Sequence, residues 1–95
     1  MSAFHEIKTV YKDVIAMMNK EFNSHEFILK LAQAHQSRYI RCLYEHVNSP
    51  HPFKVTHGHL AQMLDDFGEL IEKIDSKNSP NIFGESSDAS VYRKR

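Results

Sequence analysis

The first 49 residues of this 95-residue chain contain neither glycine nor proline, the two residues that most strongly interrupt helices. Apolar side chains in this stretch recur with the helical repeat of about 3.6 residues. Over residues 3–22 they share one arc of the helical wheel, which predicts an amphipathic helix. Over residues 24–47 the apolar arc is wider, which predicts a second helix that contacts two neighbours.

The boundary between these two helices falls at Phe22-Asn23-Ser24. Asn23 and Glu26 have the spacing of a capping box, in which the two residues bind each other's backbone N–H groups. Asn and Ser also prefer helix caps to helix interiors, so we predict two separate helices. Because the two apolar arcs are nearly in phase across the junction, one long bent helix is the alternative.

A third apolar arc predicts a helix over residues 57–75. Thr56 is placed to cap its N-terminus, and the proline-containing residues 49–53 form the preceding loop. The arc continues in phase past Gly68, and a glycine inside a helix costs only about 1 kcal/mol relative to alanine. We therefore predict one unbroken third helix, which argues against a DNA-binding helix-turn-helix in this segment.

The three segments together predict an all-α fold, a small three-helix bundle over residues 1–75 with a polar tail over residues 76–95. The isolated apolar residues of this Ser- and Asn-rich tail cannot by themselves offset the entropy of ordering the chain. We expect the tail to be flexible or docked on the bundle. The predicted core comprises Ile7, Tyr11, Val14, Met18, Ile28, Leu31, Tyr39, Leu43, Leu60, Leu64, Phe67, Ile71 and Ile74.

Composition argues against several classes of protein. The 12 basic and 12 acidic residues give a formal net charge of zero, so no global field attracts nucleic acid or membrane. The single cysteine, Cys42, rules out an internal disulfide and fits a reducing compartment. No apolar run approaches the ~18 residues that a membrane span needs, and no signal-peptide pattern opens the sequence. We therefore expect a small soluble protein of the cytoplasm.

Motifs that carry catalysis are missing from the sequence. It contains no phosphate loop, paired catalytic carboxylates or nucleotide fingerprint, and a body this small seldom encloses a large cleft. We predict that the protein is not an enzyme and needs no cofactor. The leading hypothesis is a non-enzymatic protein-interaction or regulatory module. Homo-oligomerisation fits the same hypothesis, because one small core yields only a few kcal/mol of stability.

Two groups of residues are candidates for contact with a protein partner. The tail carries spaced hydrophobic residues in polar surroundings, and residues 48–75 are the acidic part of the chain, with two basic and five acidic residues. The partner-binding candidates are Ile82, Phe83, Tyr92, Asp65, Asp66, Glu69 and Glu72.

The first alternative is a nucleic-acid-binding regulator that uses a basic helix face and the basic C-terminus. Its residues are Lys30, Arg38, Arg41, Arg93, Lys94 and Arg95. We do not favour it, because Glu26 and Glu45 lie on the same side of the second helix and dilute the positive field.

The second alternative is a metal-binding domain built on one thiol and several imidazoles. Its ligands would be Cys42, His46, His57 and His59. Cys42 and His46 are four residues apart and share one helix face, but the chain has no second cysteine and matches no standard ligand spacing. A buried cysteine in a helical core is the more ordinary interpretation.

Overall fold

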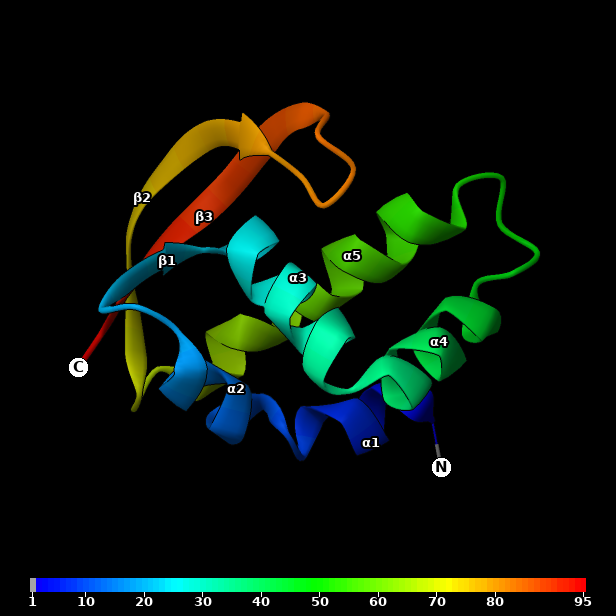
Figure 1. Ribbon diagram of the computed structural model, residues 1–95, viewed down its shortest axis with the longest axis horizontal. Helices are drawn as coiled ribbons and strands as arrows, with labels where there is room; N and C mark the ends of the chain where they lie inside the picture. The colour runs from blue at the N-terminus through cyan, green and yellow to red at the C-terminus, as the bar shows by residue number, and fades with distance from the viewer. Residues whose placement is uncertain (1) are drawn as a thin grey trace.

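The computed structural model describes residues 2–95 and shows an α/β fold in place of the predicted all-α bundle (Figure 1). Over these residues the chain forms five α-helices, one 3-10 helix and a three-stranded antiparallel sheet. The prediction of a three-helix bundle is therefore wrong. The sheet lies toward one end of the molecule and α4 lies at the other (Figure 1). No helix within this part of the chain has both the length and the apolarity to cross a membrane.

The elements follow one another along the chain in the order α1 (Ala3–Lys8), α2 (Tyr11–Met17), β1 (Glu21–Asn23), α3 (Ser24–Ala34), α4 (Gln36–Glu45), α5 (Pro52–Gln62), the 3-10 helix η1 (Met63–Phe67), β2 (Ile71–Pro80) and β3 (Ser86–Lys94). β3 is the central strand and runs antiparallel to both neighbours. Lys73 pairs with Tyr92 but Asp75 pairs with Val91, so the register contains a bulge at Ile74.

The first predicted helix, over residues 3–22, is divided into two short helices and a strand. α1 ends at Lys8, and the hydroxyl of the capping residue Thr9 donates to the carbonyl oxygen of Glu6 at 2.6 Å. α2 ends at Met17, and the backbone is extended at the capping residue Met18. β1 then pairs with β3, which brings Phe22 opposite Tyr92. The helical periodicity did not reveal β1 because its partner strand lies at the other end of the sequence.

The predicted boundary at Asn23 is confirmed. The Asn23 side chain accepts from the N–H of Glu26 at 2.8 Å, and the Glu26 carboxylate accepts from the N–H of Asn23 at 2.9 Å, which is a complete capping box. The alternative of one long bent helix is wrong, because β1 precedes the cap. The segment 24–47 is itself divided at His35, whose φ of −133° and ψ of 60° leave the helical region. This break allows α3 and α4 each to pack against α5.

The third predicted helix, over residues 57–75, is wrong at both ends. α5 begins at Pro52, because the fixed φ of proline suits the first helical position. Thr56 therefore lies inside α5 and is buried instead of capping it. α5 ends at Gln62, η1 follows, and the chain is extended from Ile71 onward.

Residues 76–95, for which we predicted a flexible or docked tail, belong mostly to the β2–β3 hairpin. Its turn is held by the Asn81 side chain, which accepts from the N–H groups of Phe83 at 2.9 Å and Glu85 at 3.1 Å. Gly84 completes the turn with a φ of 83°. β3 is anchored to the body by two buried side chains, Ala89 and Tyr92.

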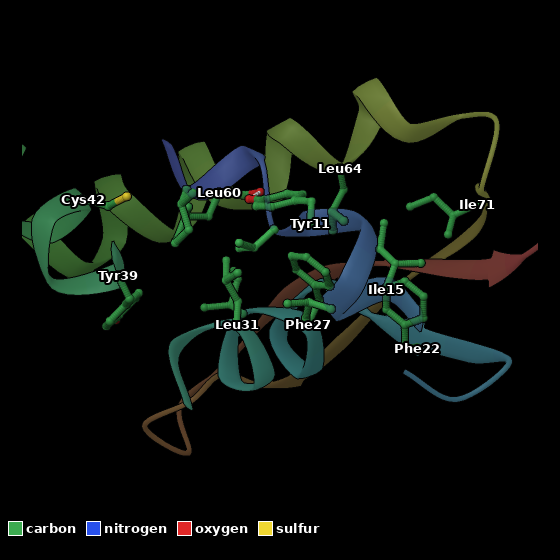
Figure 2. Close-up of a cluster of buried hydrophobic side chains, with 14 of the residues drawn as sticks. Tyr11, Ile15, Phe22, Phe27, Leu31, Tyr39, Cys42, Leu60, Leu64 and Ile71 are labelled. Carbon is green, nitrogen blue, oxygen red and sulfur yellow. Dashed lines mark hydrogen bonds between the residues drawn. The ribbon is translucent and has the colours of Figure 1, made fainter. Parts of the chain in front are cut away.

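The core packs where the helices meet the sheet (Figure 2). The hydroxyl of Tyr11 donates to the carbonyl oxygen of Leu60 at 2.5 Å, and its ring packs against Phe27 and Phe67. Of the predicted core, Ile74 is 37% exposed at the bulge, and three residues, Met18, Leu43 and Phe67, are only partly buried. The buried members are Ile7, Tyr11, Val14, Ile28, Leu31, Tyr39, Leu60, Leu64 and Ile71, joined by Phe4, Val10, Ile15, Phe22, Phe27, Cys42, Ala89 and Tyr92.

Candidate functional site

A groove of about 780 Å³ lies between the start of α3, the first half of α5 and the turn of the β2–β3 hairpin, and we call it the hairpin groove. Figure 1 shows the hairpin turn reaching over toward α5. The capping box at Asn23 fixes where α3 begins, and Pro52 fixes where α5 begins. Local sequence signals therefore position two of its three walls.

Two aromatic rings stand in this groove without belonging to the core. Phe53 comes from α5 and is 47% exposed, and Phe83 comes from the hairpin turn and is 53% exposed. Their rings meet edge to face, with centroids 4.8 Å apart. The imidazole of His57 stacks on Phe83 at 6.0 Å. The groove thus presents an apolar surface that the folded chain leaves half open to water.

Two histidines hold the walls of the groove in place. The Nδ1 atom of His25 lies 3.2 Å from Ser79 Oγ and its Nε2 atom lies 3.1 Å from Ser87 Oγ, so one imidazole on α3 contacts both strands of the hairpin. His57 Nε2 lies 2.6 Å from the hydroxyl of Tyr39 on α4. Burial lowers the pKa of His57, and the neighbouring His25 lowers it further.

The charges of the groove lie on opposite walls. Lys54 comes from α5, whereas Glu85 and Asp88 come from the hairpin. Within residues 2–95, none of Lys54, Glu85 and Asp88 takes part in an ion pair. A ligand in the groove therefore meets a basic wall on one side and an acidic wall on the other.

The contact between Ser87 and His25 resembles the hydroxyl–imidazole pair of acyl-transfer enzymes. In those enzymes a carboxylate on the second ring nitrogen stabilises the protonated imidazole. Here that nitrogen contacts the neutral hydroxyl of Ser79. We therefore interpret His25 as a link between α3 and the hairpin.

The structure disperses the predicted partner-binding residues. Phe83 lines the hairpin groove, and the adjacent Ile82 is partly buried against the core. Tyr92 is only 3% exposed, and its hydroxyl donates to the carboxylate of Asp65 at 3.2 Å. Its side chain is therefore part of the fold.

The other acidic candidates lie away from the groove. Asp66 pairs with Lys8 at 2.7 Å and Glu72 pairs with Arg95 at 3.6 Å, while Glu69 is exposed. Of the seven partner-binding candidates, Phe83 is the one that lines the hairpin groove.

The six nucleic-acid candidates form two separate groups. The exposed Lys30, Arg38 and Arg41 lie on α3 and α4, whereas residues 93–95 lie at the end of β3, toward the opposite end of the molecule (Figure 1). The terminal group is held against the body by an Arg93–Glu21 pair at 3.2 Å, by Lys94 on the carbonyl oxygen of Ala16, and by Arg95 on that of Gly68. The fold therefore does not merge them into one basic surface.

The four metal candidates are likewise divided. Cys42 is fully buried, and burial together with the Glu45 and Glu6 carboxylates raises the pKa of its thiol to about 11. His59 stacks on Phe4 at 3.8 Å with His46 nearby, while His57 binds Tyr39. Across residues 2–95, no three side chains of His, Cys, Asp or Glu gather closely enough to hold a metal ion.

Sequence reasoning missed His25, Lys54 and Phe53 as parts of the site. The proline-containing pattern of residues 49–53 predicts a loop at Phe53, although proline is also common at the first position of a helix, where Pro52 lies. His25 gave no signal of its own, because its contact with Ser87 spans 62 positions of sequence. No family model, curated protein or solved structure matches this chain.

Proposed function

We propose that this protein is a non-enzymatic interaction module that binds an extended segment of a partner protein in the hairpin groove. The observation that carries this proposal is the pair of half-exposed rings, Phe53 and Phe83, in contact with each other beside a hollow of about 780 Å³. Aromatic residues in water-excluding pockets supply much of the binding energy at protein interfaces. A partner side chain seated against these rings would bury both.

The charges of the walls specify the chemistry of the partner segment. Two carboxylates, Glu85 and Asp88, face the groove from the hairpin, and one ammonium, that of Lys54, faces it from α5. A segment with an apolar or aromatic anchor complements this surface when it places a basic residue toward the hairpin and an acidic residue toward α5. The two carboxylates make the basic residue the stronger requirement.

The outer edge of β2 offers a less suitable surface for an extended segment. This edge strand carries Lys73, Asp75 and Lys77, contains the bulge at Ile74 and ends at Pro80. Charged side chains, bulges and proline are the features that prevent a further strand from pairing with a sheet edge. We therefore place the partner in the groove, where side-chain contacts dominate.

The proposal can be tested by selecting binders from a library of displayed random peptides. We expect enriched peptides to combine an aromatic or large apolar residue with a neighbouring Lys or Arg, and to bind less tightly as salt rises. In calorimetric titrations, Phe83→Ala should weaken the selected peptides about tenfold or more, because it removes an anchor of the interface. Val55→Ala is the matched control, since Val55 is a 42% exposed residue of α5 outside the groove.

Two outcomes would contradict the proposal. One is a selection in which no peptide is enriched on the folded protein. The other is a set of peptides that bind Phe83→Ala and Asp88→Asn as tightly as the unaltered chain. Peptides that bind Val55→Ala with unchanged affinity but lose affinity for both groove variants would support it.

A further inference from the structure

The outward face of α4 carries an apolar stripe that the fold leaves uncovered. Its members are Ile40, Tyr44 and Val47, which are 61%, 73% and 53% exposed. Their spacing of four and three residues places them along one side of the helix. Val47 lies two residues beyond the end of α4 and continues this side, since its N–H donates to the carbonyl oxygen of Tyr44 at 3.1 Å. We call this surface the α4 stripe.

The helix is therefore apolar on two sides. Its inner side contributes the buried Tyr39 and Cys42 to the core, which accounts for the inward packing of α4. The stripe makes no such contribution. Contiguous exposed apolar side chains are a common feature of surfaces that bind another protein.

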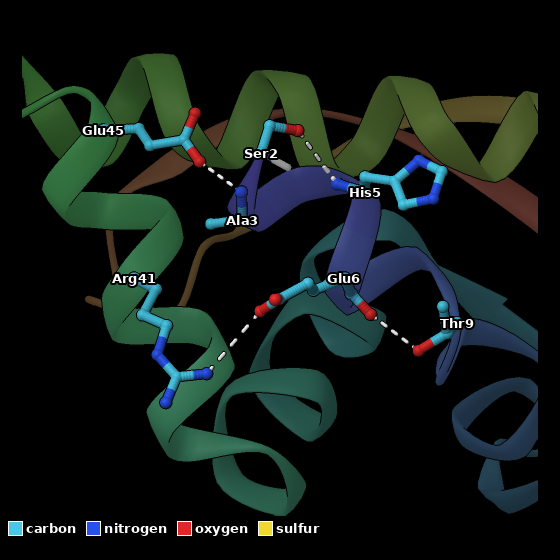
Figure 3. A network of polar contacts seen from close by, with 7 residues as sticks. All are labelled: Ser2, Ala3, His5, Glu6, Thr9, Arg41 and Glu45. Atoms are coloured by element: carbon cyan, nitrogen blue, oxygen red, sulfur yellow. Dashed lines mark hydrogen bonds and ion pairs between the residues drawn. The ribbon is translucent and has the colours of Figure 1, made fainter.

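A shallow hollow beside the stripe is bordered by charged groups. It has a volume of about 520 Å³ and lies between α1 and α4, lined by Ala3, Glu6, Ile40, Arg41, Tyr44 and Glu45. The Arg41 guanidinium lies 3.6 Å from the Glu6 carboxylate, and the Glu45 carboxylate accepts from the N–H of Ala3 (Figure 3). An apolar centre with a polar rim is the usual composition of a protein interface.

The distribution of charge along α4 makes this surface complementary to itself. Arg38 lies in the N-terminal half of the helix, Arg41 lies at its middle, and Glu45 is its last residue. When two copies of α4 pack antiparallel, Ile40 of one copy faces Val47 of the other, and Arg41 approaches Glu45. The helix dipoles then also oppose each other favourably. The formal net charge of zero means that the two copies do not repel.

We propose that the α4 stripe is the contact through which two copies of this chain form an antiparallel twofold dimer. A twofold contact uses the same patch on both copies, as the self-complementary charges require. In this dimer Tyr44 lies near the twofold axis. The Tyr44 ring of each copy can then cover the hollow between α1 and α4 of the other copy, beside its Ile40. The stripe shares no residue with the hairpin groove, so the dimer does not depend on the proposed function.

Sedimentation velocity over a range of protein concentrations tests the dimer. The unaltered protein should pass from the mass of one chain to twice that mass as concentration rises. Tyr44→Glu should remain at the mass of one chain, because it buries two charges at the axis. Val55→Glu, which adds the same charge to an exposed apolar position of α5, should dimerise as the unaltered protein does. Far-ultraviolet circular dichroism should show the same fold for all three proteins.

Charge reversal tests the antiparallel arrangement. Arg41→Glu alone and Glu45→Arg alone should each weaken the dimer about tenfold, because each places like charges across the axis. An equimolar mixture of the two variants should recover dimerisation, since every cross-axis pair then has opposite charges. A parallel pair would bring Arg41 against Arg41 and would not be weakened by Arg41→Glu alone.

Three results would overturn the proposal: a monomer at every concentration, equal dimerisation of Tyr44→Glu and Val55→Glu, or a mixture that stays as monomeric as its components. Peptide binding by Tyr44→Glu separates the two proposals. If this variant still binds groove peptides, the groove proposal stands whether or not the protein dimerises.

Discussion

Gly58 and Gly84 lie near the hairpin groove in different backbone conformations. Gly58 lies inside α5, and a Cβ added there would meet nothing within 4 Å. Gly84 lies in the hairpin turn with a φ of 83°, a conformation that L side chains rarely adopt. The two positions therefore allow the conformational role of glycine to be separated from its small size.

We expect Gly58→Ala to raise the free energy of unfolding by about 0.5–1 kcal/mol, because alanine restricts the unfolded chain and favours the helix. Gly84→Ala should lower it by about 1–2 kcal/mol, because an alanine is strained in the left-handed region. Urea denaturation of both variants measures these changes. Two shifts of the same sign would show that at least one of the local conformations is wrong.

The surroundings of His57 disfavour its protonated form. Burial lowers its pKa below the ordinary value of 6.5, with His25 as the second cause, so the folded state binds a proton less readily than the unfolded chain. Its contribution to stability is therefore complete above pH 6.5 and is lost as the pH falls through the lower folded pKa. An NMR titration should give a His57 midpoint below 6.5, and His25→Gln should raise it only in part. A midpoint at or above 6.5 would contradict the buried position.

Local sequence signals predicted individual contacts and buried residues better than they predicted the bounds of helices and strands. The capping box at Asn23 and Glu26 is a contact between near neighbours, and it is present in the structure. Tyr11 and Leu31 are buried as their helical phase predicts. Thr56, in contrast, had the chemistry of a cap but lies inside a helix, because Pro52 starts α5 a turn earlier. The sequence alone did not show whether Pro52 or Thr56 marks the start of this helix.

The sequence did not predict strands β2 and β3, because their apolar and polar residues do not alternate. Ile71 is the one buried residue of β2, and β3 buries only Ala89 and Tyr92, so neither strand shows the apolar–polar alternation of a half-buried sheet. Leu70, Ile71 and Ile74 also continue the helical phase of the preceding segment. The hairpin groove was hidden for a related reason, because its walls come from three elements that are distant in the chain. The sequence named Phe83 as a partner-binding candidate, but its neighbour Phe53 could be found only from the fold.

The attachment of the hairpin depends mainly on Tyr92. This residue is buried, pairs with Phe22 of β1, stacks on its ring at 5.9 Å, and donates a hydrogen bond to Asp65. Tyr92→Ala should cost about 3–5 kcal/mol, as large aromatic deletions in cores do. A domain of this size has only a few kcal/mol of stability, so most of the variant should be unfolded at 25 °C.

Phe83→Ala is the control for this prediction, because Phe83 is 53% exposed in the same hairpin. Its effect on the free energy of unfolding should be about 0.5 kcal/mol or less. Circular dichroism with urea denaturation measures both variants. A Tyr92→Ala protein as stable as Phe83→Ala would mean that the hairpin is not part of the cooperative fold.

At the scale of the whole molecule, one core joins all the helices to the sheet. The molecule measures 36 × 28 × 19 Å, so no residue is far from its surface and the hydrophobic core is small. The same core contains ionisable groups, since Tyr11 and Cys42 are fully buried and Tyr39 nearly so. Charging any of them in place would put an uncompensated negative charge among apolar side chains.

Stability should therefore fall at alkaline pH. Burial raises the pKa of the Cys42 thiol from 9.0 to about 11 and that of Tyr39 from 10.0 to about 12, and it raises the pKa of Tyr11 further. Each folded pKa lies above its unfolded value, so the neutral groups stabilise the fold fully below pH 9 and lose this contribution as the pH rises toward 12. Urea denaturation at successive pH values should show this loss beginning near pH 9.

Cys42→Ala separates the titration of the thiol from its packing. At pH 7 the variant should be less stable by about 1 kcal/mol, because a small buried group is removed. Between pH 9 and pH 11 its stability should fall less steeply than that of the unaltered protein, because one of the titrating groups is gone. The two stability curves should therefore converge as the pH rises. Parallel curves over this range would show that the thiol titrates alike in the folded and unfolded chains, which a fully buried Cys42 does not allow.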